Sequence, residues 1–160
     1  MAMHDEWAKI VASSLDWEQA HANFDKAIAD LPAELRGKRP DNFPHSAWEL
    51  VFHIDATQHD LLDFSRNPHY EEMKWPDEYW PKNPAPASDK AWDDCVARIR
   101  SDVAEFKQFA VDNASKLGEK IPHGTGQTYL RTVIVSVDHT SYHVGQIIAV
   151  RRLLNAWYAS

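Results

Sequence analysis

The chain has 160 residues, of which 44% are hydrophobic and 11% aromatic, so residues 1–160 can fill the core of one domain without disulfides. Its formal net charge is −7 and no run of Lys or Arg is longer than a pair, which argues against nucleic acid as a partner. A single cysteine, no signal-peptide pattern and no uncharged apolar run of about 18 residues lead us to expect a cytoplasmic protein without a membrane partner.

A stripe of apolar or small side chains, at steps of three and four, runs from about residue 5 to residue 31. Its members are Trp7, Ile10, Ser14, Trp17, His21, Phe24, Ile28 and Leu31. This period predicts one long first helix with a coiled-coil-like seam, which Pro32 ends. Residues 32–44 follow as a loop.

The second expected helix runs from about residue 45 to residue 66. Ser46 followed by Glu49 matches a capping box, which marks the start of a helix. Its inward stripe consists of Leu50, Ile54, Thr57, Leu61 and Phe64. His53 lies at the edge of this stripe near the middle of the helix. It is therefore a candidate metal ligand.

Residues 67–88 carry five prolines and several aromatic side chains but no helical period. An extended chain of about 20 residues reaches about 66 Å, which is twice the length of a helix of about 22 residues. This segment can therefore return along the whole domain as a crossover, so that the second and third helices run parallel. Its length and its aromatic side chains also fit a lid.

The third expected helix begins after Ser88, a suitable N-cap, and is ended by Gly118. Its core stripe, in unbroken steps of four and three, is Trp92, Val96, Ile99, Val103, Phe106 and Ala110. Cys95 lies at the margin of this stripe. We interpret it as a small buried side chain rather than a nucleophile, because no basic neighbour in the sequence would lower its pKa.

The fourth expected helix runs from about residue 128 to residue 157 and is apolar around almost its whole circumference. Such a helix must be covered on every side, either at the centre of the domain or in a subunit interface, and we expect a homodimer. The turn before it contains Gly124, Thr125 and Gly126 without the strand and Lys of a phosphate-binding loop. Together the four helices predict an all-α fold, a four-helix bundle with a long crossover between helices two and three.

Two histidines in the fourth helix, His139 and His143, stand four residues apart. Side chains at this spacing point the same way, about one turn apart, so both imidazoles can converge on one metal ion. His53 lies at a similar depth in its own helix and supplies a third imidazole. Three such ligands leave positions open for water or substrate, as in catalytic sites, and suit Zn, Ni, Fe or Cu. Histidines that only hydrogen-bond in the core are the alternative.

Two known kinds of metal site do not fit this pattern. The helix of a zinc peptidase carries Glu directly after its first His, whereas Thr140 follows His139. A di-iron carboxylate bundle needs repeated Glu-x-x-His, and neither His53 nor His143 has a Glu three residues before it. Neither chemistry is therefore expected.

Two polar residues are expected to support the metal ligands through hydrogen bonds. Glu49 lies four residues before His53, and Gln146 lies three residues after His143. Each has a second explanation, because Glu49 also fits a helix cap and Gln146 a hydrogen bond to a neighbouring helix.

Several segments together resemble the DinB-like superfamily: residues 46–53 with their final His53, the Tyr79-Trp80-Pro81 run, residues 126–128, and the Asp138-His139 and Tyr142-His143-x-Gly145-Gln146 motifs. The resemblance implies an up-down-down-up four-helix bundle, often a homodimer, in which three histidines hold a divalent metal. In this chain those ligands are His53, His139 and His143. Relatives include metal-dependent transferases and isomerases that act with thiols such as bacillithiol and mycothiol.

Two functions of different classes follow from these patterns. The first is an enzyme whose divalent ion (Zn, Ni or Fe) activates either a low-molecular-weight thiol for S-transfer or a water for hydrolysis of a small-molecule substrate. The second is a non-catalytic, stress-related metal-binding or interaction module. A metal-dependent rate with any substrate would distinguish them.

Overall fold

The computed structural model describes residues 3–157, and over this range the chain is helical and contains no β-strand. The helices are α1 (Met3–Ser13), α2 (Phe24–Ile28), α3 (Ala47–Arg66), α4 (Asp89–Asp112) and α5 (Tyr129–Leu153). Two short 3-10 turns lie at Ala33–Leu35 and Ala114–Lys116. None of these helices combines the length and the apolar composition that a membrane span requires.

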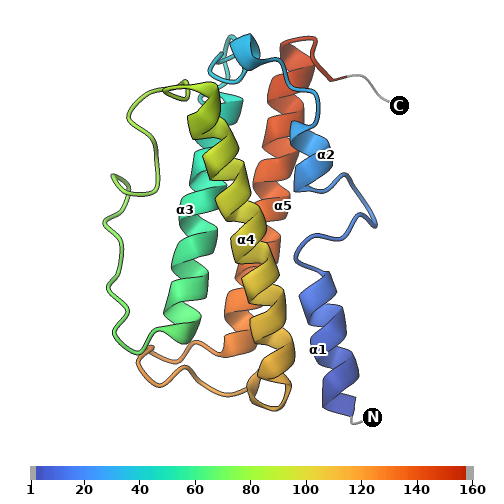
Figure 1. Cartoon of the computed structure of the whole chain (residues 1–160), viewed down its shortest axis with the longest axis vertical. Coiled ribbons are helices and arrows are strands. Elements are labelled where there is room, and N and C mark those ends of the chain that lie inside the picture. Colours follow the sequence, from blue (N-terminus) through green and yellow to red (C-terminus); the bar gives the residue numbers. More distant parts are fainter. Residues whose placement is uncertain (1–2, 158–160) are drawn as a thin grey trace.

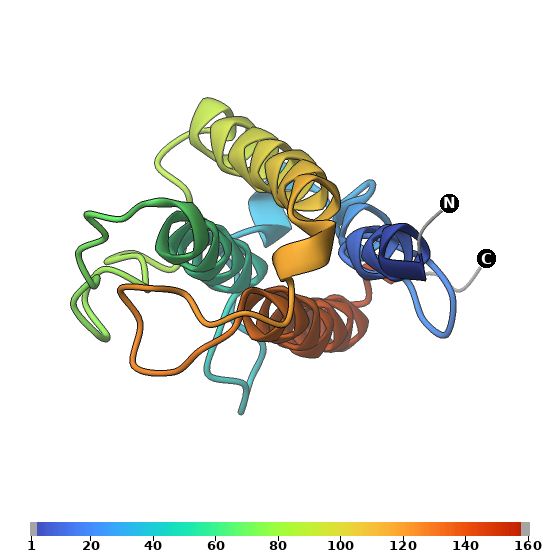
Figure 2. The same ribbon diagram turned by 90° about the horizontal axis from the view of Figure 1, so that it is seen from below.

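The three long helices lie side by side and enclose the centre of the molecule (Figures 1 and 2). In Figure 1, α3 and α4 run in the same direction and α5 runs back against them. Residues 67–88 leave the lower end of α3 and run along the outside of that helix to the upper end of α4. This crossover therefore passes over the middle of α3, where a site in the helix would face it.

The start of α3 follows from its capping box. The Ser46 side chain accepts from the Glu49 amide, and the Glu49 carboxylate accepts from the Ser46 amide at 2.8 Å. Ser88 caps α4 in the simpler way, with its side chain accepting from the Ala91 amide. These starts confirm the prediction, but α4 ends at Asp112 rather than near Gly118. There the Asn113 side chain donates to the carbonyl of Phe109 and a 3-10 turn follows.

The core forms where the three long helices meet. Leu50 and Ile54 of α3, Ile99 of α4 and Ile147 of α5 are 1% exposed or less. The predicted stripe of α4 is largely confirmed, because all its members except the half-buried Val103 are buried. Cys95 is completely buried, and burial, together with the nearby Asp55, raises the pKa of its thiol. It is a buried core side chain, as expected.

The prediction of one continuous first helix over residues 5–31 is wrong. Residues 14–23 leave the helix, because the Ser14 hydroxyl donates to the Val11 carbonyl and Asn23 both donates to the Asp16 carbonyl and caps α2. Such side-chain bonds compete with helical ones. The seam is also misplaced, since Trp7, Ile10 and Trp17 are 62%, 53% and 42% exposed. The side chains that α1 and the following turn bury are Ala8, Ala12 and Leu15.

Candidate metal centre

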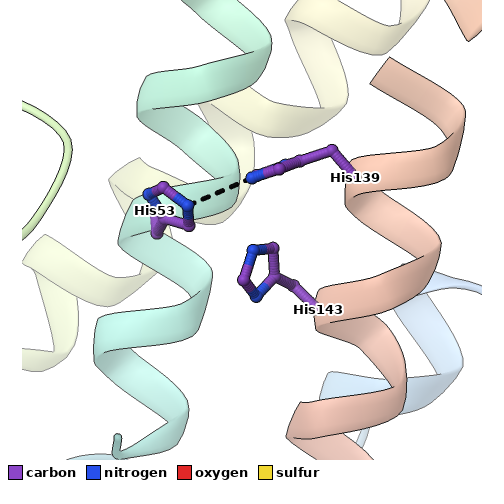
Figure 3. Close-up of side chains that lie close together, drawn as sticks. All are labelled: His53, His139 and His143. Carbon is purple, nitrogen blue, oxygen red and sulfur yellow. Dashed lines mark hydrogen bonds between the residues drawn. The ribbon is translucent and has the colours of Figure 1, made fainter. Parts of the chain in front are cut away.

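Three histidines converge between the middles of α3 and α5 (Figure 3). His53 projects from α3 toward His139 and His143, which stand one above the other on α5. One nitrogen from each ring can be chosen so that all lie within 4.8 Å of one another. Nitrogens that bind zinc at about 2.1 Å with tetrahedral angles lie about 3.4 Å apart, so small ring rotations would bring this group to binding distances. The three side chains could therefore hold a metal ion.

Hydrogen bonds orient two of the three rings. The Nδ1–H of His53 donates to the carbonyl oxygen of Tyr79 at 3.1 Å. The Nδ1–H of His143 donates to Oε1 of Gln146 at 2.7 Å. With their protons on Nδ1, both rings have a lone pair on Nε2, which is the form that binds metal.

The third ring, that of His139, forms a hydrogen bond with the ring of His53. Nε2 of His139 lies 3.1 Å from Nε2 of His53. Because His53 already carries its proton on Nδ1, His139 is the donor in this contact. Metal binding by Nε2 of His139 requires this proton to leave or to move to Nδ1. The contact is therefore the one that a bound cation would replace.

All three imidazoles are neutral at physiological pH. Burial, followed by the neighbouring rings, lowers the pKa of His139 to about 3. Burial lowers the pKa of His53 to about 4 and also lowers that of His143. Neutral imidazole is the metal-binding form, so burial prepares the ligands for a cation without competition from protons.

The crossover covers the outer side of His53. The Trp80 ring stacks on the His53 ring, with centroids 4.0 Å apart and planes within 9°. Its other face stacks on His45 at 4.4 Å. An imidazole held between a helix and an indole ring has little freedom to turn away from its partners.

The Asp60 carboxylate of α3 also binds this crossover segment. The hydroxyl of Tyr79 donates to one oxygen of Asp60 and the hydroxyl of Tyr70 to the other, each at 2.8 Å. Burial and then the Asp60 carboxylate raise the pKa of both tyrosines, so both hydroxyls stay protonated. Asp60 therefore holds the crossover at two points, one of them in the residue whose carbonyl orients His53.

A cavity of about 610 Å³ adjoins the histidine cluster between α3, α5 and the crossover. Its lining residues are His53, Thr57, Asp60, Leu61, Glu72, Met73, Trp75, Tyr79, Trp80, His139, Tyr142 and His143. This volume is within the range of pockets that bind small molecules, about 300–1,000 Å³. The open side of the cluster thus faces a space of substrate size.

The two expected supporting residues differ in outcome. Gln146 lies against His143, as its spacing predicts. Glu49 forms no hydrogen bond with His53: its carboxylate binds the Arg39 guanidinium and the Ser46 amide. Burial opposes ionisation of Glu49, but these bonds lower the pKa of its carboxyl overall. Its role is the helix cap, the alternative explanation from the sequence.

The hydrogen-bond partner of His53 differs from the one expected from the sequence, which was Glu49. The acceptor for His53 is the backbone carbonyl of Tyr79, and every residue has such a group, so no side-chain pattern points to it. The available signal was the Tyr79-Trp80-Pro81 run itself, which places two aromatic rings in a proline-rich connection.

These features define an all-helical protein in which three histidines from two helices could hold a metal ion. The family model of the DinB superfamily matches residues 16–147. The chain belongs to this superfamily, as its motifs predicted. A comparison with curated proteins gives no match.

Proposed function

We propose that this protein is a metal-dependent enzyme in which His53, His139 and His143 hold a divalent ion, of the Zn, Ni or Fe type, and a small molecule reacts in the adjoining cavity. The observation that supports this proposal most is the convergence of three neutral imidazoles on the wall of a cavity of about 610 Å³. A purely structural metal is normally enclosed by four protein ligands, whereas three ligands leave a position for a reactant.

The reaction that fits is S-transfer with a small thiol, or hydrolysis. A divalent ion supplies a Lewis acid that lowers the pKa of a thiol or of water. The chain's own residues supply the rest. Gln146 and the Tyr79 carbonyl fix two imidazoles in their ligand tautomers, and Trp80 stacks against one of them. The aromatic walls of the cavity would exclude water from a bound substrate.

We also propose the family topology for the whole chain. In this arrangement the arm formed by α1 and α2 takes the place of the first helix of an up-down-down-up bundle. The directions of α3, α4 and α5 in Figure 1 support this topology, as does the position of α1 against α4.

The metal site is tested by titrating the purified, metal-free protein with Zn and Ni ions. We expect one tight equivalent. His139→Ala should weaken it by more than about 100-fold, since even residues that only support a metal ligand are worth about 10- to 100-fold. His69→Ala is the matched control, because His69 is an exposed histidine outside the cluster.

The catalytic part of the proposal has its own measurement. Rates of thiol conjugation and of ester hydrolysis, measured over a substrate panel, should disappear with a chelator and return with the metal. Unchanged metal affinity in His139→Ala would contradict the three-histidine site. Tight metal binding without any metal-dependent rate would instead support the non-catalytic alternative.

A further inference from the structure

The charges around the cavity are all of one sign. Among its lining residues, Asp60 and Glu72 carry carboxylates, and none is Lys or Arg. The remaining titratable side chains in this lining are the three histidines and two tyrosines. The protein therefore presents a negative potential to whatever part of a substrate lies away from the histidines. A phosphate or carboxylate group there would meet repulsion and no basic partner.

Aromatic rings stand at the edge of the same cavity. Trp75, from the crossover, and Tyr142, from α5, both line it and are 68% and 64% exposed. Trp80 differs, because both of its faces are occupied by His45 and His53. The faces of exposed indole and phenol rings attract cations through the ring quadrupole. Such rings beside carboxylates form a surface suited to a positive group.

Two side chains in the lining, Asp60 and Thr57, have oxygen atoms with capacity for further hydrogen bonds. A carboxylate can accept about four, and Asp60 accepts one at each oxygen from Tyr70 and Tyr79. The buried hydroxyl of Thr57, one turn before Asp60 on α3, has no hydrogen-bond partner among the residues that the structure describes. The Asp60 carboxylate could therefore accept from an N–H donor of an amine, whereas the Thr57 hydroxyl is closed off from the cavity.

We propose that the cavity binds a substrate carrying a positively charged amine or a quaternary ammonium group. This group lies between the aromatic edge and the carboxylates of Asp60 and Glu72, while the reacting end of the molecule points to the histidines. Only the assignment of that reacting end rests on the function proposed above. The inference narrows the substrate class, since a thiol or ester that is anionic over its whole length does not suit this lining.

Choline and 3,3-dimethylbutan-1-ol test the proposal, because they have the same shape and hydroxyl group and differ in the positive charge. Neither the quaternary nitrogen of choline nor the quaternary carbon of its analogue can bind a metal. A difference in affinity between the two compounds therefore reports the preference for positive charge and not metal coordination. Binding of each is measured by ligand-observed NMR to zinc-loaded and to metal-free protein. We expect choline to bind about fivefold more tightly or better.

Glu72→Gln should reduce this preference at least twofold, whereas Glu71→Gln should leave it unchanged. Glu71 is the exposed neighbour of Glu72 and does not line the cavity, so it controls for general surface charge. Equal binding of the two compounds, no detectable binding of choline, or an equal effect of both substitutions would overturn the proposal. Zinc content is measured on the same samples. Failure to bind zinc overturns the metal site alone, because the charge preference is also read from the metal-free protein.

Discussion

Tyr79 contributes two different groups to the candidate metal centre. Its carbonyl accepts from Nδ1 of His53, and its hydroxyl donates to Asp60. The hydroxyl bond to Asp60 fixes the position of Tyr79, and the carbonyl bond of Tyr79 orients His53. The orientation of His53 therefore depends on a carboxylate two turns away on the same helix.

Tyr79→Phe tests this connection, because it removes the hydroxyl and keeps the ring and the carbonyl. We expect zinc affinity to fall by about 10-fold, the lower part of the range for residues that support a ligand. The measurement is a competition titration against a chelator of known affinity. Loss of a single hydrogen bond should also cost about 1 kcal/mol of unfolding free energy.

Tyr70→Phe is the matched control. It removes the equivalent bond to the other oxygen of Asp60, but Tyr70 has no hydrogen bond to a histidine of the cluster among the described residues. We expect a similar loss of stability with zinc affinity close to that of the wild type. An equal loss of affinity in both variants would show that Tyr79 supports the fold and does not specifically orient His53.

At the scale of elements, the start of α3 is joined to the crossover. The hydroxyl of Ser46 accepts from the Glu49 amide and donates to the carbonyl of Pro84. Ser46 is completely buried, and its bond to the Glu49 amide is buried, while its bond to the carbonyl of the exposed Pro84 is partly buried. The cap that begins α3 thus also anchors the end of the segment that covers His53.

Ser46→Ala should therefore destabilise the protein more than the loss of an ordinary cap. We expect the free energy of unfolding to fall by about 2 kcal/mol, the upper end for loss of an N-cap. The substitution also removes the hydrogen bond to the Pro84 carbonyl, which adds to this loss. Ser88→Ala is the comparison, because Ser88 caps α4 while exposed to solvent, and about 1 kcal/mol is expected. The measurement is urea denaturation of both variants. A larger loss in Ser88→Ala would contradict the anchoring role of Ser46.

Elements determined by local signals could be predicted from the sequence. The capping box at Ser46 and the stripe of α4 depend on residues within a few positions of one another, and both were found. The spacing of His139 and His143 is local in the same sense. Predicting His53 as the third ligand required only that its helix pack against theirs at a matching depth. The Tyr79 carbonyl could not be found, because its role depends on the path of an irregular segment.

The first helix shows the opposite case. Large side chains such as Trp7 and Ile10 suggested the buried face, but the contact with α4 is made through Ala8 and Ala12. Small residues allow two helices to approach closely, so the bulky ones remain outside. A hydrophobic period indicates a helix but does not decide which of two possible stripes faces the core.

For the molecule as a whole, α5 is not covered on every side by the described chain. Ile134, Tyr142 and Leu153 are 55%, 64% and 56% exposed. From their spacing they fall within about 100° of the helix circumference. They form a discontinuous apolar stripe, about two and three turns apart along the helix, and the exposed Asp138 and Arg152 lie on the same face. We propose that a second copy of the chain packs along Ile134 and Leu153, beside the Tyr142 ring that lines the cavity, forming the homodimer expected from the sequence.

Light scattering coupled to size-exclusion chromatography measures the oligomeric state directly. We expect the wild-type protein to have the mass of a dimer at micromolar concentration. Ile134→Lys should shift it toward the monomer, because an ammonium group would be buried in the interface without a partner. Ile10→Lys places the same charge at an exposed apolar residue of α1 and should leave the dimer intact. A monomeric wild type, or equal effects of the two substitutions, would contradict an interface along α5. Because Tyr142 belongs both to this stripe and to the edge of the cavity, such an interface would also bring the second copy close to the entrance of the candidate site.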